Sequence, residues 1–160
     1  MTRTTRIYVQ INIPNGAVSK DENNAEIVVK LGKHLGVDIE HQQTDACHRM
    51  LSRSKEFPPI LLVKFCSKEM KNVLLSAKKK TRNLESTDIG MNASSRMVYL
   101  NEHLSPNNRI LFKKTMELKQ HGFKYVWTKD CMILVRKNEA ASVKHIATNE
   151  DLQQLLQENK

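Results

Sequence analysis

The stretch Pro58-Pro59-Ile60-Leu61-Leu62-Val63-Lys64-Phe65 contains the clearest β-strand in the chain. Its second part combines branched and aromatic apolar side chains, the composition that favours strands. The two prolines in front of it mark where the strand begins, because proline cannot donate to a sheet. The rest of the first half can be assigned outward from this strand.

A helix follows the strand directly. Ser67 is suited to cap its N-terminus. Its apolar side chains recur at helical spacing, at Met70, Val73, Leu74 and Ala77. The helix ends in Lys78-Lys79-Lys80. On the other side of the strand, residues 52–56 form a polar loop, and a strand is expected around 43–50.

The beginning of the chain supplies a further strand and helix. Residues 7–13 alternate apolar and polar side chains, which predicts a half-buried strand closed by Pro14-Asn15-Gly16. A helix is expected over 22–35, with Gly36 at its C-terminal end. A short strand near 87–91 would complete a βαββαβ domain over 6–91. This split βαβ arrangement has an antiparallel sheet with both helices on one face and the other face free for a ligand.

The second half predicts a smaller domain over 96–158, after a linker at 92–95. It opens with a strand at 97–100. Ser105-Pro106 is typical of a helix start, and that helix should end at Gly122. Three strands are expected at 123–128, 131–136 and 142–146. Thr148 opens the last helix through a capping-box variant. The fold class is therefore α+β in two domains.

The composition indicates a polyanionic partner. The 160 residues carry a formal net charge of +9, with 39% hydrophobic residues, enough for a packed core. The alternative is a basic surface without a function. Three cysteines far apart, Cys47, Cys66 and Cys131, predict neither a disulfide framework nor a metal site. No cofactor is expected. Because the cysteines are not expected to form disulfides, the chain should be intracellular, cytoplasmic or nuclear. No apolar run is long enough to span a membrane, so no membrane insertion is expected. Its abrupt polar start is typical of a fragment of a longer protein.

The positive charge is concentrated in two segments. Residues 47–82 hold ten Lys and Arg against two Glu, and residues 109–137 hold eight against two acids. Lys78, Lys79, Lys80 and Arg82 place four cations at one helix end, more than the helix dipole requires. We expect the two segments to line a common groove for nucleic acid. The alternative is that these side chains merely solvate helix surfaces.

The candidate nucleic-acid-binding residues follow from these segments. In the first half they are Arg49, Arg53, Lys64, Lys78, Lys79, Lys80 and Arg82. In the second half they are Arg109, Lys113, Lys114, Tyr125, Arg136 and Lys137.

Aromatic residues offer a second mode of contact. A strand places Tyr125 and Trp127 on one face, which would be a stacking platform if exposed. We expect Trp127 to be in the core instead, because a small domain needs its only tryptophan there. In the first half Tyr8 is the one aromatic side chain expected to stack on a base. Binding should therefore rely on phosphates, with little sequence preference.

Two stretches resemble known families. The order His48-Arg49, Pro58 to Phe65 and Ala77-Lys78-Lys79-Lys80 resembles the RRM-like domain of LINE-retrotransposon first-open-reading-frame proteins. Residues 99–105, 123–127 and 134–139 resemble the C-terminal domain of insect relatives of the baculovirus FP protein. The sequence departs from the first pattern at Leu51 and lacks exposed aromatics on the third strand, where Ile60 and Leu62 stand.

The resemblance implies binding of single-stranded RNA or DNA and nucleic-acid chaperone activity in a retrotransposon ribonucleoprotein. It also implies self-association through an upstream coiled coil, for which this chain has no heptads. An enzyme is not expected, because no phosphate loop, metal cluster or catalytic constellation is recognisable. The rival interpretation is an FP-like assembly adaptor whose basic surface contacts protein partners.

Overall fold

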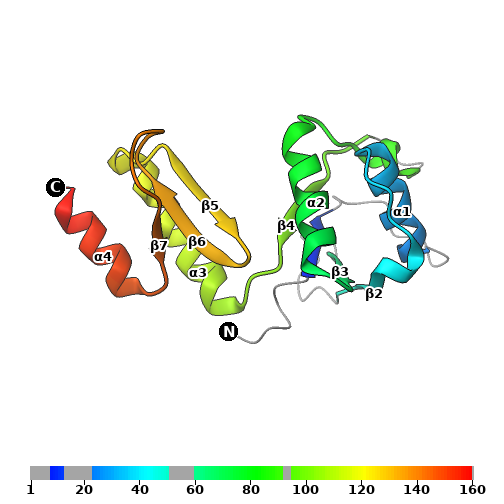
Figure 1. The fold of residues 1–160 in the computed structure, drawn as a ribbon, viewed down its shortest axis with the longest axis horizontal. Helices are drawn as coiled ribbons and strands as arrows, with labels where there is room; N and C mark the ends of the chain where they lie inside the picture. The colour runs from blue at the N-terminus through cyan, green and yellow to red at the C-terminus, as the bar shows by residue number, and fades with distance from the viewer. Residues whose placement is uncertain (1–7, 13–22, 51–59, 92–94, 160) are drawn as a thin grey trace. The chain divides into compact units, whose positions relative to one another are not determined.

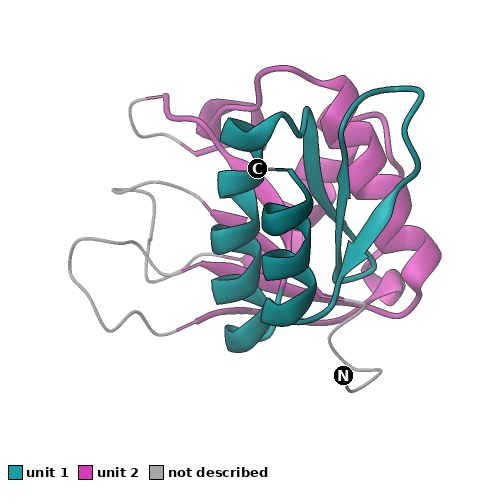
Figure 2. Ribbon diagram, turned by 90° about the vertical axis from the view of Figure 1, so that its left-hand side faces the viewer, with its two compact units in different colours: residues 1, 104–160 teal, residues 2–103 magenta. Residues whose placement is uncertain are grey.

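The computed structural model describes residues 8–12, 23–50, 60–91 and 95–159. They form two compact units, an N-terminal unit over 2–103 and a C-terminal unit over 104–160 (Figure 2). Each unit has its own antiparallel sheet and its own hydrophobic core. The α+β fold class is therefore confirmed.

The N-terminal unit contains a four-stranded sheet with two α-helices (Figure 1). Its elements in chain order are β1 (Tyr8–Asn12), α1 (Asn24–His34), the 3-10 helix η2 (His41–Gln43), β2 (Thr44–Arg49), β3 (Leu61–Phe65), α2 (Lys68–Lys80), the 3-10 helix η3 (Ser86–Ile89) and β4 (Tyr99–Glu102). The strand order is β2-β3-β1-β4, and all neighbours are antiparallel. The sheet is therefore antiparallel throughout, as predicted.

The fourth strand is not where the sequence placed it. The stretch expected as a strand at 87–91 is largely the 3-10 helix η3. The strand expected to open the second domain is β4, which pairs with β1 through Gln10 and Asn101 in the first sheet. Val98 and Leu100 are buried in the N-terminal core, so burial assigns this strand to the first unit. The division between the units follows His103, and the expected linker at 92–95 lies mostly outside the described residues.

Both helices of the N-terminal unit cover the same face of its sheet. Successive strand residues point to opposite faces. One core cluster contains Val9 and Ile11 of β1, Val63 of β3, Leu31 of α1 and Leu74 of α2. Because these strand residues alternate with Tyr8, Gln10, Asn12, Leu62 and Lys64, the latter set faces away from the helices.

A glycine lets α1 pack closely against the chain that follows it. Gly32 is buried inside the helix, and a Cβ added there would lie 2.7 Å from the backbone oxygen of Val37 and 2.7 Å from Cδ1 of Ile39. The amide of Val37 donates to Gly32 O at 2.8 Å. This hydrogen bond holds the backbone of Val37, including its carbonyl oxygen, close to the helix. Backbone atoms cannot move aside as a flexible side chain would.

We therefore expect Gly32→Ala to destabilise the N-terminal unit by about 1–3 kcal/mol, the usual cost of overpacking. Helix propensity alone would favour alanine by about 1 kcal/mol, so the clash decides the sign. Urea denaturation followed by circular dichroism measures the change. The adjacent exposed variant Lys33→Ala serves as control and should stay within about 0.5 kcal/mol. A more stable Gly32→Ala protein would contradict the close approach.

The C-terminal unit is a second two-layer structure. Its elements are α3 (Pro106–Thr115), the 3-10 helix η4 (Met116–His121), β5 (Tyr125–Lys129), β6 (Met132–Arg136), β7 (Lys144–Ile146) and α4 (Asn149–Glu158). The strands form a sheet in the order β5-β6-β7. Leu111, Thr115 and Leu118 are buried, and they lie along one side of α3 and η4. Leu111, Leu152 and Leu155 pack with Ile133 and Val135, so α3 and α4 cover one face of the sheet.

The predicted caps of this unit are confirmed. The hydroxyl of Ser105 accepts from the backbone amide of Asn108, with Pro106 at the first helical position. Thr148 and Asp151 form the capping box of α4. Backbone amides of Ala147 and Thr148 both donate to the Asp151 carboxylate and hold its pKa below the usual range. Across the described residues, no helix is both long and apolar enough to cross a membrane.

Candidate nucleic-acid interface

The first candidate surface is the sheet face of the N-terminal unit that its helices leave uncovered. We call it the N-terminal open face; it consists of Tyr8, Gln10, Asn12, His48, Leu62, Lys64, Tyr99 and Asn101. The register aligns these side chains in rows across the strands, with Tyr99 opposite Asn12 and Leu62 opposite both Gln10 and His48. The face thus combines aromatic rings with amide and imidazole groups.

Tyr99 is the most exposed aromatic residue on this surface. Its side chain is 52% exposed although it stands on a paired strand. Tyr8 is half-buried and lies beside the ring of His103, with centroids 6.2 Å apart. The strand register separates Tyr8 from Tyr99 by four residues, or about 14 Å along the strands. Two rings at that separation can each contact a different base of one strand.

The cation on this face is already engaged. Lys64 lies opposite Tyr8 and forms a salt bridge with Asp45 of β2. The hydrogen bond that the Lys64 ammonium donates to the Asp45 carboxylate raises the pKa of Lys64. Because the pair cancels most of the local charge, the N-terminal open face is suited to contact bases more than phosphates.

The basic cluster of residues 78–82 lies at the C-terminal end of α2. The Lys78 ammonium donates to the carbonyl of Thr81 at 3.2 Å and helps to close the helix. Lys79, Lys80 and Arg82 are exposed. These three cations are therefore available to a partner, whereas Lys78 also has a structural contact.

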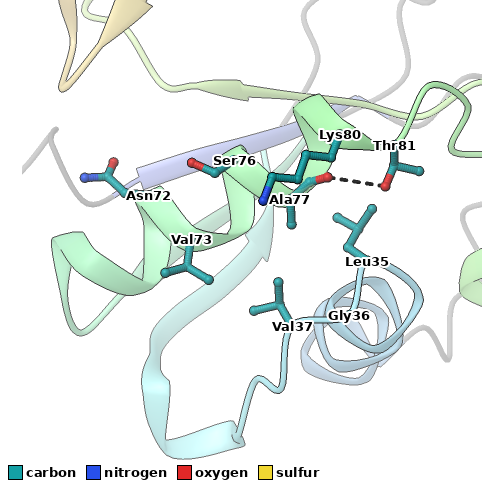
Figure 3. A pocket seen from close by; sticks show the side chains of 9 residues that line it. All are labelled: Leu35, Gly36, Val37, Asn72, Val73, Ser76, Ala77, Lys80 and Thr81. Carbon is teal, nitrogen blue, oxygen red and sulfur yellow. Dashed lines mark hydrogen bonds between the residues drawn. The ribbon is translucent and has the colours of Figure 1, made fainter.

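Lys80 also borders a shallow groove of about 540 Å³ between α2 and the end of α1 (Figure 3). Its apolar wall comes from Leu35, Val37, Val73 and Ala77. Val73 is 51% exposed there. The hydroxyl of Thr81 donates to the carbonyl of Ala77 at one end of the groove. An apolar hollow with a cation at its rim can hold a side chain of a partner.

The second candidate surface is the uncovered sheet face of the C-terminal unit. We call it the C-terminal open face; it consists of Tyr125, Trp127, Lys129, Met132, Leu134, Arg136 and His145. Trp127 lies opposite Leu134, whereas its neighbour Val126 packs against the core. The prediction that Tyr125 and Trp127 share a face is confirmed. The prediction that Trp127 is in the core is wrong, because Phe123, Ile133 and the helix leucines already fill the covered face.

Tyr125 is surrounded by polar and charged groups. The guanidinium carbon of Arg136 lies 4.9 Å from the centre of its ring, and the ammonium of Lys124 lies 5.1 Å from it. The Nε of Arg136 is buried and has no hydrogen-bond partner within the described parts of the chain. One donor at the edge of this surface thus lacks an acceptor.

The carboxylate of Glu139 binds both Lys124 and Tyr125. Glu139 accepts from the Lys124 ammonium at 2.6 Å and from the Tyr125 hydroxyl. Hydrogen bonds from Lys124 and then Tyr125 lower the pKa of Glu139 to about 2, and the same contact raises the pKa of Lys124. Because the folded-state pKa is lowered, the contact stabilises the fold above about pH 4.5 and is lost as the pH falls toward 2. Glu139 is therefore fully ionised at neutral pH.

The side chain of Asn138 stabilises the turn that contains Glu139. The side-chain oxygen of Asn138 accepts from the amides of Ala140 at 3.0 Å and Ala141 at 2.9 Å. This local bonding is typical of Asx turns and fixes the backbone next to Glu139.

The remaining predicted residues do not all lie together. Arg109, Lys113 and Lys114 are exposed on α3, in the helix layer, and so do not share a face with Arg136. Lys137 contacts the ring of Phe123, 5.6 Å from its centre, rather than that of Tyr125. Within this unit, the predicted cations therefore lie on different faces and do not form one surface.

Arg49 is opposite Leu61, a core residue, and thus points toward the helix-covered side of the sheet. Arg53 lies outside the described residues.

Three functional candidates do not follow from the sequence. The local sequence of Tyr99 does not reveal that its strand lies beside β1. The prediction of a core position hides Trp127, and no local pattern marks Glu139 as a partner of Tyr125. The usable signal was the strict alternation of Tyr125, Trp127 and Lys129 with Val126, which places the first three on one face.

The C-terminal unit matches a known protein family. Residues 105–156, in the C-terminal unit, match the family model described as Baculovirus FP protein domain 2. No curated protein matches the chain. The described C-terminal unit is therefore similar to the second domain of baculovirus FP proteins.

Proposed function

We propose that this protein binds single-stranded nucleic acid, RNA in the first instance, through the N-terminal open face and the exposed cations of residues 78–82. The observation that carries the proposal is the 52% exposure of Tyr99 on a sheet face that also holds Tyr8. Exposed aromatic rings on a sheet are platforms on which bases of any sequence stack. Exposed cations add attraction to phosphates that does not depend on sequence.

The RRM-like interpretation belongs to the same proposal. It is supported by the βαββαβ order and by the position of Tyr8 on the first strand. On this side of the sheet β3 carries no aromatic residue but the buried side chain of Leu62, which argues for weak base selectivity. A nucleic-acid chaperone in a LINE-type ribonucleoprotein would need such tolerant binding.

A titration of the full chain with labelled single-stranded RNA, single-stranded DNA and duplex tests this function. We expect single strands to bind more tightly than duplex, and binding to weaken steeply between about 50 and 200 mM salt. Tyr99→Leu should weaken single-strand binding by about 1–3 kcal/mol, because it removes a stacking ring. Tyr99→Phe keeps the ring and serves as the matched control. Equal binding of Tyr99→Leu and the unaltered protein would contradict the proposal.

A second candidate function is an FP-like assembly adaptor. The groove beside Val73 and Lys80 favours it, because an apolar hollow with a cationic rim suits an apolar side chain flanked by acids. The match of the C-terminal unit to an FP protein domain also fits this function. An acidic peptide that binds the protein, loses affinity in Val73→Asp and leaves nucleic-acid binding unchanged would support it.

A further inference from the structure

We propose that the C-terminal open face is a second nucleic-acid site, where a base stacks on Trp127 and the adjoining phosphate replaces the Glu139 carboxylate between Lys124, Tyr125 and Arg136. The inference rests on the proposed function, and it adds a site in the other unit. Its occupant is a single strand of nucleic acid, which supplies both an aromatic base and an anion.

The stacking part follows from the position of Trp127. The side chain is half-buried on the uncovered side of β5, next to Leu134 of β6. Both helices of this unit contribute their buried leucines to the opposite side of the sheet. An indole held by its strand neighbours loses little freedom when a base is laid on it, and base–aromatic stacking tolerates every sequence.

The phosphate part follows from the groups around Tyr125. Trp127 and Tyr125 are two residues apart on one strand, so about 7 Å separates them along it. Near the Tyr125 ring lie a guanidinium at 4.9 Å and an ammonium at 5.1 Å. The Nε of Arg136 is buried and has no acceptor among the described residues, so a shift of this side chain that exposes Nε to a phosphate oxygen would give it one. Arginine is well suited to phosphate because its donors form a rigid fork.

Glu139 occupies the position that a phosphate oxygen would take. Its carboxylate accepts from Lys124 and from the Tyr125 hydroxyl, the same donors that a phosphate would use. Because an exposed ion pair is weak in water, a doubly coordinated phosphate can displace it. Glu139 thus lowers the affinity of this site and acts as an internal competitor.

The fluorescence of Trp127 gives a direct test, because it is the only tryptophan in the chain. A labelled single-stranded oligonucleotide is titrated into the full-length protein while its anisotropy and the tryptophan emission are recorded. We expect quenching of the emission that follows the anisotropy. Trp127→Leu should weaken binding about tenfold, whereas Trp127→Phe should retain most of it.

The variant Glu139→Gln distinguishes the proposed site from an effect of misfolding, because a misfolded protein would not bind the oligonucleotide more tightly. We expect it to increase affinity about threefold or more, with the largest gain at low salt. Glu117→Gln, an exposed acid in the helix layer, changes the net charge equally and should stay within about twofold. Arg136→Gln should weaken binding and reduce the salt dependence.

Three results would overturn the inference. If anisotropy reports binding that Tyr99→Leu weakens, but Trp127 emission, Trp127→Leu and Glu139→Gln show no change, the second site is absent and the proposed function stands. If poly-glutamate quenches Trp127 as strongly as the oligonucleotide does, the face binds acidic protein segments instead. If no single strand binds at all, both proposals fail together.

Discussion

Replacing Lys71 by methionine should lower the free energy of unfolding of the N-terminal unit by about 3–5 kcal/mol. Lys71 is completely buried on α2, and its ammonium lies 2.8 Å from Oε1 of Glu102 on β4. Removing the cation would leave a carboxylate charged in a site from which water is excluded. The pair also joins α2 to the strand that enters the sheet last in the sequence.

The double variant Lys71→Met/Glu102→Leu separates the loss of a partner from the loss of the pair. Because it removes both charges and keeps the volume, it should be much more stable than Lys71→Met and close to the unaltered protein. Lys79→Met, at an exposed position of the same helix, should change stability by less than about 0.5 kcal/mol.

Urea denaturation by circular dichroism measures these changes. The emission of Trp127 follows the C-terminal unit, where that residue lies, so a transition that shifts in circular dichroism alone assigns the loss to the N-terminal unit. A loss below about 1 kcal/mol for Lys71→Met would mean that the buried charge is solvated in another way.

Removing the exposed cations at the end of α2 should have the largest effect on nucleic-acid binding. Lys79→Ala/Lys80→Ala/Arg82→Ala eliminates three exposed charges and leaves Lys78, which bonds to Thr81, in place. Each lost phosphate contact reduces the slope of log K against log salt by about 0.7 on single strands, so the triple variant should lose about 2 from the slope. Affinity should fall tenfold or more at low salt.

The triple variant Lys33→Ala/Arg96→Ala/Lys119→Ala is the matched control, because it removes three exposed cations from other places. Its salt slope should change much less. Similar losses in the two variants would mean that overall charge alone attracts the polyanion. An unchanged slope in the first variant would show that residues 79–82 only solvate the helix end.

The sequence determined the local elements well where side chains alternate or repeat at helical spacing. Leu61 to Phe65 forms a strand, Ser67 caps α2, and Thr148 caps α4, as their residue types predict. The prediction of a strand at 87–91 is wrong because the local sequence there is weak. A short segment with few apolar residues has no strong preference, and the core position of Ile89 together with the turn at Gly90 makes it a 3-10 helix.

Only the tertiary structure decided which sheet Tyr99 to Glu102 joins. Its local sequence is a good strand in either unit, but partner choice depends on burial of Leu100 and on the distant charge of Lys71. Long-range packing also decided whether the face of the sheet that carries Trp127 is covered by the helices. Alternation placed it with Tyr125, yet nothing local reveals which face the helices cover, because that depends on how helix leucines far along the chain fill the core. The sequence thus determined elements, caps and charge, whereas long-range packing decided which rings remain exposed for a ligand.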